Sequence, residues 1–176
     1  MKPKEIFNKV DQYKAKKQIS TLFELECNEE AVLTEEILKK MHRMLGGDGE
    51  YRQDMPQANT DHVQLPEASE VPRLVGHFMS QLQISRQMFH PIEYAAICHK
   101  RILELCPFND KNEEVAFLVL NLLLKQAGYE SITIKKEERE TYREILRKAQ
   151  HPSQPDIDSF IAFIGQCVLR SCEENQ

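Results

Sequence analysis

The sequence contains no tryptophan, no long apolar run and no excess of basic residues. A membrane-spanning helix needs about 18 consecutive apolar residues, so we expect no membrane segment. The opening MKPKEIFNKV is not followed by an apolar stretch, so we expect no signal peptide. The net charge of -5 argues against nucleic-acid binding, because such binding depends on lysine and arginine contacts with phosphate.

Cysteine is present, but in an odd number and without the spacing of metal ligands. Most of the thiols lie inside apolar periodic segments, which is typical of buried, reduced cysteines in a cytoplasmic protein. They are Cys27, Cys98, Cys106, Cys167 and Cys172. We therefore predict reduced thiols and a cytoplasmic location.

The overall composition is that of one soluble globular domain. Hydrophobic residues make up 41% and charged residues 29% of the 176 residues, which is far from the composition of disordered chains. A chain of this length buries roughly 70% of the surface that its unfolded form exposes. We expect a single domain over residues 1–176.

Apolar residues recur every three or four positions over most of the chain, so a mainly α-helical fold is predicted. We expect helices over 4–25 (an opening helix and a second short one), 34–45, 69–84, 90–105, 113–128, 137–150 and 158–172. Thr34 is a suitable N-cap, and Gly46 ends the helix that follows it. The helix over 113–128 is apolar on most sides, so we expect it to be central and buried and to end at Gly128.

The segment over residues 46–68 differs in character, because it is rich in glycine, proline, asparagine and aspartate. Two stretches in it have the composition of short strands, EYRQ over 50–53 and HVQL over 62–65. We predict a loop or a small β-hairpin at this place.

A phosphate-type loop is indicated by CPFNDKNEEVAF over residues 106–117, because this stretch joins one predicted helix to the start of the next. Free N–H groups and the positive end of the helix dipole make a helix start a natural phosphate site. Glu113 and Glu114 occupy that first turn, where each stabilises the helix by roughly 0.3–1 kcal/mol. The same two carboxylates oppose an incoming phosphate.

The order and sequence style of the segments resemble the Fic (Fido) family, which includes protein AMP-transferases. The stretches that carry the resemblance are TEEILKKMHRML, GEYR, SEVPRL, HPIEYAAICHKRILELCPFNDKN, LVLNLLLKQAGY and ERETYREIL, and they cover about residues 30–170. The resemblance implies a mainly helical Fic-like domain with a small β-hairpin flap over residues 49–66. It also implies that residues 106–117 are the family's catalytic loop.

The active loop of that family reads H-P-F-x-[D/E]-G-N-[G/K]-R-x-x-R. The matching positions are Pro107, Phe108, Asp110 and Asn112. At the departing positions, Cys106 replaces histidine, Lys111 the first glycine, Glu113 the glycine or lysine, Glu114 the first arginine and Phe117 the second arginine. The residues that shape the loop are thus present, whereas the groups that carry its chemistry are replaced.

The loop residues have two sets of interpretations. By the resemblance, Cys106 stands in the place of the base that accepts a proton from the target hydroxyl, and Asp110 in that of the Mg²⁺ ligand. Alternatively, Cys106 is a small apolar filler and Asp110 a turn residue. Asn112 either contacts a nucleotide or acts as an N-cap. Lys111 either contacts a phosphate of the nucleotide or is a solvated side chain. Phe117 is expected to pack into the core.

Histidines give a weaker signal than the loop. His99 lies on an apolar face beside Ala95 and Ala96, so we expect a buried structural histidine. The remaining histidines form no ligand-spaced cluster. The family's inhibitory motif, [S/T]-x-x-x-E-[G/N], does not occur in the chain, in keeping with loss of the arginine that it would contact.

These features predict a Fic-like binding or regulatory scaffold without AMP transfer and without a firmly implied cofactor. Loss of a general base typically costs on the order of 10²–10⁴ in rate. The alternative is an AMP- or phosphotransferase that depends on ATP and Mg²⁺ and uses altered catalytic residues. By the resemblance, Tyr51, Arg52, His62 and Val63 on the flap would dock an extended segment of a protein target or partner by strand addition.

Overall fold

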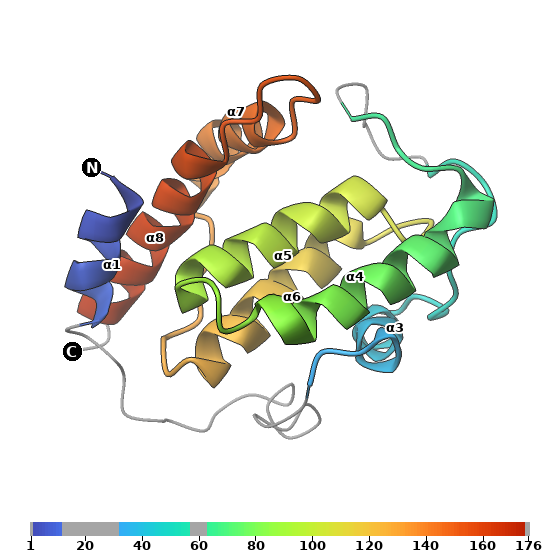
Figure 1. Ribbon diagram of the computed structural model, residues 1–176, viewed down its shortest axis with the longest axis horizontal. Helices are drawn as coiled ribbons and strands as arrows, with labels where there is room; N and C mark the ends of the chain where they lie inside the picture. Colours follow the sequence, from blue (N-terminus) through green and yellow to red (C-terminus); the bar gives the residue numbers. More distant parts are fainter. Residues whose placement is uncertain (1, 12–31, 57–62, 175–176) are drawn as a thin grey trace.

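The described part of the chain is mainly helical (Figure 1). A computed structural model describes residues 2–11, 32–56 and 63–174. Its helices are α1 (Pro3–Asp11), α3 (Glu35–Met44), α4 (Val71–Ser85), α5 (Pro91–Leu105), α6 (Asn112–Gln126), α7 (Arg139–Ala149) and α8 (Ile157–Glu174), with 3-10 turns η1 (Ala68–Glu70) and η2 (Lys136–Glu138). None of the helices in these ranges combines the length and the apolar character that spanning a bilayer requires.

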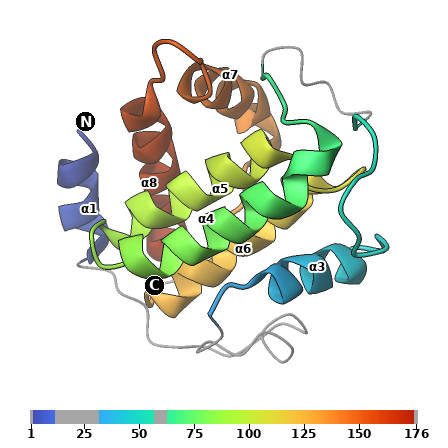
Figure 2. The same cartoon turned by 45° about the vertical axis from the view of Figure 1, so that its right-hand side comes forward.

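Helix α6 lies at the centre of the fold, as its apolar sequence predicted. Helix α5 packs along it, and α3 contacts both α6 and α4. Figure 2 shows α4, α5 and α6 side by side, with α3 below them next to α6. Val115, Val119, Leu120 and Leu124 of α6 are fully buried. Burial of each such side chain contributes roughly 1.5–3 kcal/mol, so this helix supplies much of the core.

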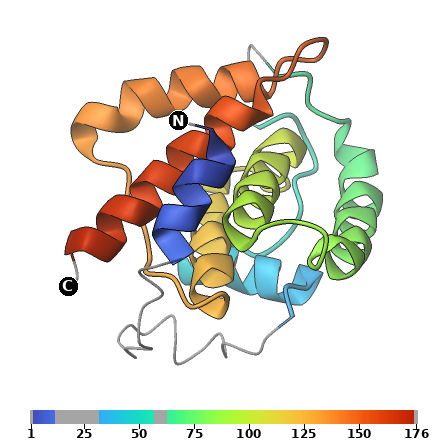
Figure 3. The same ribbon diagram turned by 60° about the vertical axis from the view of Figure 1, so that its left-hand side comes forward.

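Helix α8 forms the second part of the core and contacts α1, α5 and α7. Figure 3 shows α1 lying along α8, which brings segments from opposite ends of the chain together. Gly165 permits this close approach, because a Cβ atom at its position would lie 2.9 Å from Cγ2 of Ile6. Phe160 and Ile164 of α8 are fully buried in the same layer.

The predicted helix ends are confirmed at α3 and α6. The Ile37 N–H donates a hydrogen bond of 3.3 Å to Oγ1 of Thr34, the N-cap of α3. Gly46 (φ 87°) and Gly128 (φ 84°) follow the ends of α3 and α6. Both have the left-handed conformation that glycine adopts without strain.

The cysteines in the described ranges are free and buried, as predicted. They are Cys98, Cys106, Cys167 and Cys172. The predicted second short helix of the 4–25 segment and Cys27 lie outside the described residues.

An extended link joins α6 to α7 over residues 129–135, as predicted. Asn121 of α6 accepts a hydrogen bond from the Ile132 N–H at 2.8 Å and donates one to the Ile132 carbonyl at 3.1 Å. Arg170 of α8 donates to the Thr133 carbonyl at 3.0 Å. The link is therefore tied to two helices, and it leads the chain back to α7 beside the start of α6.

His99 is buried, as predicted, and connects α5 to α7. Its Nε2 atom lies 2.7 Å from the hydroxyl oxygen of Tyr142. Its ring packs against the rings of Phe117 and Phe160. Burial lowers the pKa of His99 from 6.5 to about 4, because the charged imidazolium would lose its hydration in the core.

We predict that His99 makes the protein less stable as the pH falls from 6.5 to about 4. The unfolded chain binds the proton more readily than the folded one, so the free energy of unfolding decreases by roughly 3 kcal/mol over this interval. Urea unfolding at a series of pH values measures the change. His99→Gln should remove most of this slope, whereas His77→Gln, at an exposed position, should retain it. Equal slopes in all three proteins would contradict the assignment.

Candidate functional site

The turn between α5 and α6 adopts an unusual backbone conformation. Cys106 (φ 44°) and Lys111 (φ 56°) both lie in the left-handed region, which costs a residue with a side chain about 1–2 kcal/mol relative to glycine. The Cys106 N–H donates to the Ile102 carbonyl at 2.8 Å and so closes the end of α5. Lys111 precedes the first residue of α6.

Asn112 closes the turn by binding both backbone groups of Phe108. Its Oδ1 atom accepts a hydrogen bond from the Phe108 N–H at 2.9 Å, and its Nδ2 atom donates to the Phe108 carbonyl at 2.8 Å. The predicted N-cap role of Asn112 is wrong, because α6 begins at Asn112 itself and the side chain points back toward Phe108. The buried amide is thereby occupied in shaping the loop.

His42 of α3 contacts the loop from the opposite side. It is 2% exposed, and its ring stacks on that of Phe108 with a centroid distance of 4.0 Å. Its Nδ1 atom accepts a hydrogen bond from the Gly49 N–H at 3.1 Å, so the ring proton lies on Nε2. Nε2 donates to Oδ1 of Asp110 at 3.0 Å. Gly47 is needed here, because a Cβ atom would lie 2.2 Å from Nε2 of His42.

Asp110 is held by protein groups at both carboxylate oxygens. Oδ1 accepts from His42, and Oδ2 lies 3.1 Å from Nζ of Lys111. These hydrogen bonds, first that from His42 and then that from Lys111, lower the pKa of Asp110. Sequence reasoning did not identify His42 as a partner of the loop, since 68 residues separate it from Asp110.

Arg52 ties the segment before α4 to the loop. Its side chain is 1% exposed, and its backbone N–H donates to the Pro107 carbonyl at 2.9 Å. The guanidinium donates to the carbonyls of Cys106 at 2.8 Å and Asp54 at 3.1 Å, and also to that of Pro66. Arg52 is therefore a structural residue in this conformation.

The predicted hairpin is not observed in the described part of the flap. Residues 50–53 and 63–65 are not strands, and the Arg52 N–H bonds to the Pro107 carbonyl in the loop. Tyr51 also points inward, with 7% exposure and a hydroxyl that donates to Glu35 at 2.8 Å. Of the other predicted docking residues, His62 lies outside the described ranges, and Val63 borders a cavity beside the loop.

Cys106 lies at the edge of this cavity but is almost closed off from solvent. Its side chain is 2% exposed. Burial raises the pKa of the thiol to about 11, although the charge of Arg52 acts in the opposite direction. The thiol is therefore protonated at neutral pH.

The cavity has a volume of about 1010 Å³ and lies between the loop, the first turn of α6 and α7. A second cavity of about 450 Å³ adjoins it toward the extended link. The two share the lining residues Glu113, Glu114, Tyr142 and Arg143. We refer to the two cavities together as the α6–α7 groove.

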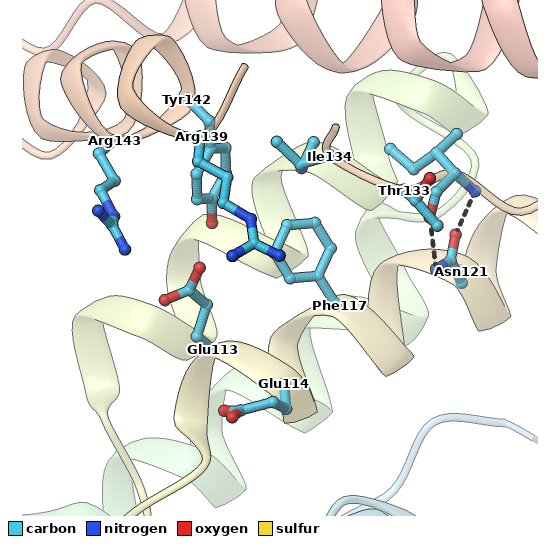
Figure 4. Close-up of a pocket in the computed structure, with 10 residues that line it drawn as sticks. Glu113, Glu114, Phe117, Asn121, Thr133, Ile134, Arg139, Tyr142 and Arg143 are labelled. Atoms are coloured by element: carbon cyan, nitrogen blue, oxygen red, sulfur yellow. Dashed lines mark hydrogen bonds between the residues drawn. The ribbon is translucent and has the colours of Figure 1, made fainter. Parts of the chain in front are cut away.

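Side chains from α6 and α7 face each other across this groove (Figure 4). Glu113 and Glu114 come from the first turn of α6, and Arg139 and Arg143 from α7. The ring of Phe117 packs on those of His99 and Tyr142, with centroid distances of 4.6 and 5.5 Å, so its predicted contact with the core is observed. Phe117 also lines the smaller cavity.

The arginines of α7 were not identified as site residues from the sequence. Arg139, Arg143 and Arg147 recur every four residues and so share one face of the helix. Each of them lines one or both cavities of the α6–α7 groove. The four-residue spacing was visible in the sequence, but it is equally typical of a solvated helix face.

The described helices pack around α6, and the turn over residues 106–111 leads from α5 into it. The sequence model of the Fic/DOC family matches residues 32–124, which is more than half of the chain. The chain therefore belongs to the Fic/DOC family.

Similar proteins carry the same family name. The "Protein adenylyltransferase Fic" of Aedes aegypti is 32% identical over 148 residues, covering 81% of this chain and 29% of the relative. That of Nematostella vectensis is 30% identical over 151 residues, covering 82% of this chain and 34% of the relative. The chain thus spans about a third of the length of these curated relatives.

Solved structures share the fold. A Fic-domain signalling protein of Bacteroides thetaiotaomicron has a TM-score of 0.75 at 23% identity, covering 98% of this chain and 70% of the other. Fic-1 of C. elegans has a TM-score of 0.71 at 22% identity, covering 87% of this chain and 46% of the other. The agreement extends the family match to nearly the whole chain at the level of the fold.

The residues at the loop do not fit the magnesium nucleotide that the family implies. Both oxygens of Asp110 are engaged by His42 and Lys111. In the described ranges, no group of three or more His, Cys, Asp or Glu side chains is arranged to hold a metal ion. Carboxylates of Glu113 and Glu114 stand at the helix start, where a phosphate would need positive charge.

We predict that Arg52→Ala lowers the free energy of unfolding by roughly 3 kcal/mol, because the buried carbonyl of Cys106 and the partly buried ones of Asp54 and Pro66 lose a charged donor. Urea unfolding measures this cost. Arg73→Ala is the control, since Arg73 is exposed and pairs with Glu70 on the surface, and its cost should stay below about 0.5 kcal/mol. A cost below about 1 kcal/mol for Arg52→Ala would contradict the structural role of Arg52.

Lys111→Gly should raise the free energy of unfolding by about 0.5–1 kcal/mol, because glycine adopts the left-handed conformation without strain. Lys111→Ala is the matched control. It also removes the ammonium group beside Asp110 but keeps the strain, so it should give no gain. Thermal unfolding of the three proteins distinguishes strain from charge, and a gain shared by both variants would argue against strain.

Proposed function

We propose that this chain is a Fic-family binding module that does not transfer AMP. The observation that carries the proposal is the state of Cys106, which takes the place of the family's base. Its side chain is 2% exposed and the pKa of its thiol is raised to about 11. A thiol with this pKa is protonated at neutral pH and does not accept a proton from a target hydroxyl.

The charges at the helix start support the same proposal. Glu113 and Glu114 stand where active members of the family carry glycine or lysine and arginine. Two unit charges about 4 Å apart interact by roughly 1 kcal/mol in water and about 4 kcal/mol at an effective dielectric constant of 20. Two carboxylates at this position therefore oppose a triphosphate strongly enough to cancel much of its binding.

We propose that the partner is a protein segment that binds beside the loop. Tyr51 and Arg52 are used in internal hydrogen bonds and are not available to a partner. The docking surface that we propose is therefore the groove that Val63 borders, and not the whole flap. The free, buried cysteines favour a reducing compartment, and we place the protein in the cytoplasm.

The alternative function is transfer of AMP or phosphate from ATP with Mg²⁺. The row of arginines on α7 favours this alternative, because it lies next to the loop and could replace the phosphate contacts of the missing loop arginines. Asp110 would then hold Mg²⁺ and Lys111 a phosphate, after their mutual contact is broken.

Isothermal titration with ATP, with and without Mg²⁺, tests the proposal. We expect no binding tighter than a Kd of about 1 mM. Micromolar, Mg²⁺-dependent binding that Asp110→Ala abolishes would overturn the proposal and favour the alternative. Incubation with labelled ATP and lysate proteins is the matching activity assay, and we expect no label to be incorporated.

A variant with restored loop residues provides the positive control. Lys111→Gly, Glu113→Gly and Glu114→Arg together remove two negative charges and the charge of Lys111, and they add an arginine at the helix start. We expect at least a tenfold gain in ATP affinity over the unmodified chain, equivalent to about 1.4 kcal/mol. Unchanged affinity in this variant would mean that the loop charges do not exclude the nucleotide.

A further inference from the structure

The α6–α7 groove has walls of opposite charge. Glu113 and Glu114 contribute the charges of the α6 wall, and Arg139, Arg143 and Arg147 those of positive sign on α7, where Glu140 and Glu144 also line the groove. In the described ranges, the side chains of Glu113, Glu114, Arg139 and Arg147 form no hydrogen bond or ion pair with another residue. Arg143 has one weak contact, at 3.9 Å from an exposed carboxylate of Glu140. These charges are therefore available to a ligand.

Other charges along the groove are already paired. Asp110 is bound by His42 and Lys111. Glu144 of α7 lies 2.9 Å from Nζ of Lys148. The charges that remain for recognition are thus the arginine row on α7, the two glutamates on α6 and Glu140 of α7, whose contact with Arg143 is long.

The floor of the groove is apolar and aromatic. Tyr142 is 2% exposed and Leu146 is 9% exposed, and both come from α7 between the arginines. Phe117 lies beside Tyr142 on the α6 side. A floor of this kind accommodates the backbone and small apolar atoms of a ligand, whereas the charged walls select its side chains.

The spacing of the arginines matches that of an extended peptide. Successive arginines four residues apart on a helix are separated by about 6 Å along the axis. Side chains on one face of an extended strand, two residues apart, are separated by about 6.6 Å. Three arginines span about 12 Å, and the first, third and fifth residues of a strand span about 13 Å. Alternate side chains of a strand point to opposite faces, toward opposite walls.

We propose that the α6–α7 groove binds an extended protein segment of about five residues with alternating charge. Acidic side chains at alternate positions face Arg139, Arg143 and Arg147, and basic side chains between them face Glu113 and Glu114. The inference rests on the proposed function, since it names the partner of the same binding module. The proposed binding requires that the acidic and the basic side chains of the partner lie on opposite faces of the segment, as alternate side chains of a strand do.

A nucleotide fits this groove less well than such a peptide. The charge of a triphosphate is of one sign and is concentrated in one group. Contact with the arginine row would bring it close to Glu113 and Glu114 on the facing wall. An alternating peptide satisfies both walls at once, so charge complementarity favours the peptide.

Fluorescence anisotropy with labelled five-residue peptides tests the order of charges. The sequence Glu-Lys-Glu-Lys-Glu should bind at least tenfold more tightly than Glu-Glu-Glu-Lys-Lys, which has the same composition and net charge. Equal binding of the two peptides, or tightest binding of a peptide of five glutamates, would overturn the alternating arrangement. The measurements are made at about 0.05 M salt, where screening of exposed charges is weak.

Charge reversal on the two walls tests the location. Arg143→Glu should weaken the alternating peptide at least tenfold, whereas Arg73→Glu, the same change on the exposed surface of α4, should leave binding unchanged. Glu113→Lys with Glu114→Lys should shift the preference to the peptide of five glutamates. Arg147→Glu is a second variant on the α7 wall, and circular dichroism establishes that each variant is folded. If both α7 variants bind the peptide as tightly as the unmodified chain, the peptide binds elsewhere and the inference is overturned.

Competition with ATP separates the two proposals. If Mg²⁺-ATP displaces the bound peptide, the nucleotide enters the groove, so the exclusion of ATP in the proposed function is overturned while the peptide stands as a ligand of the groove. If neither ATP nor any of the peptides binds, the inference about the groove is overturned while the absence of nucleotide binding agrees with the proposed function. Peptide binding that Mg²⁺-ATP does not affect is the expected result.

Discussion

The buried guanidinium of Arg52 is the interaction on which the surroundings of the loop depend. A buried cation is unfavourable unless its donors are satisfied, and here the carbonyls of Cys106, Asp54 and Pro66 accept its hydrogen bonds. Because these acceptors belong to separate parts of the chain, the same contact connects the end of α5 with the segment that leads to α4. The backbone of Cys106 is thereby held against the segment that precedes α4.

The conformation of the loop is held by groups of the protein itself. Its shape depends on the Asn112 amide bound to Phe108 and on the stacking of His42 against the same residue, and none of these groups has to contact a ligand. Membership of the Fic/DOC family therefore accounts for the fold of this chain. The charges at positions 113 and 114 lie on that frame, in the first turn of α6.

Much of the fold could be predicted from the sequence, whereas much of the site could not. The buried character of α6 and the end of α3 at Gly46 arise from apolar periodicity and local backbone preferences. The role of Asn112 was mistaken, because the choice between an N-cap and a contact with Phe108 depends on the path of the turn. The partnership of His42 with Asp110 has no local signal at all, since the two are 68 residues apart.

By itself, the sequence determined where the helices form and which loop residues depart from the Fic pattern, because both are properties of neighbouring residues. Tertiary structure alone decided that Arg52 is buried and that Cys106 is closed off from solvent. It also decided that the arginines of α7 face the glutamates of α6 across one groove. These outcomes depend on packing between distant segments, whose energies are set by burial and by the geometry of hydrogen bonds across the fold.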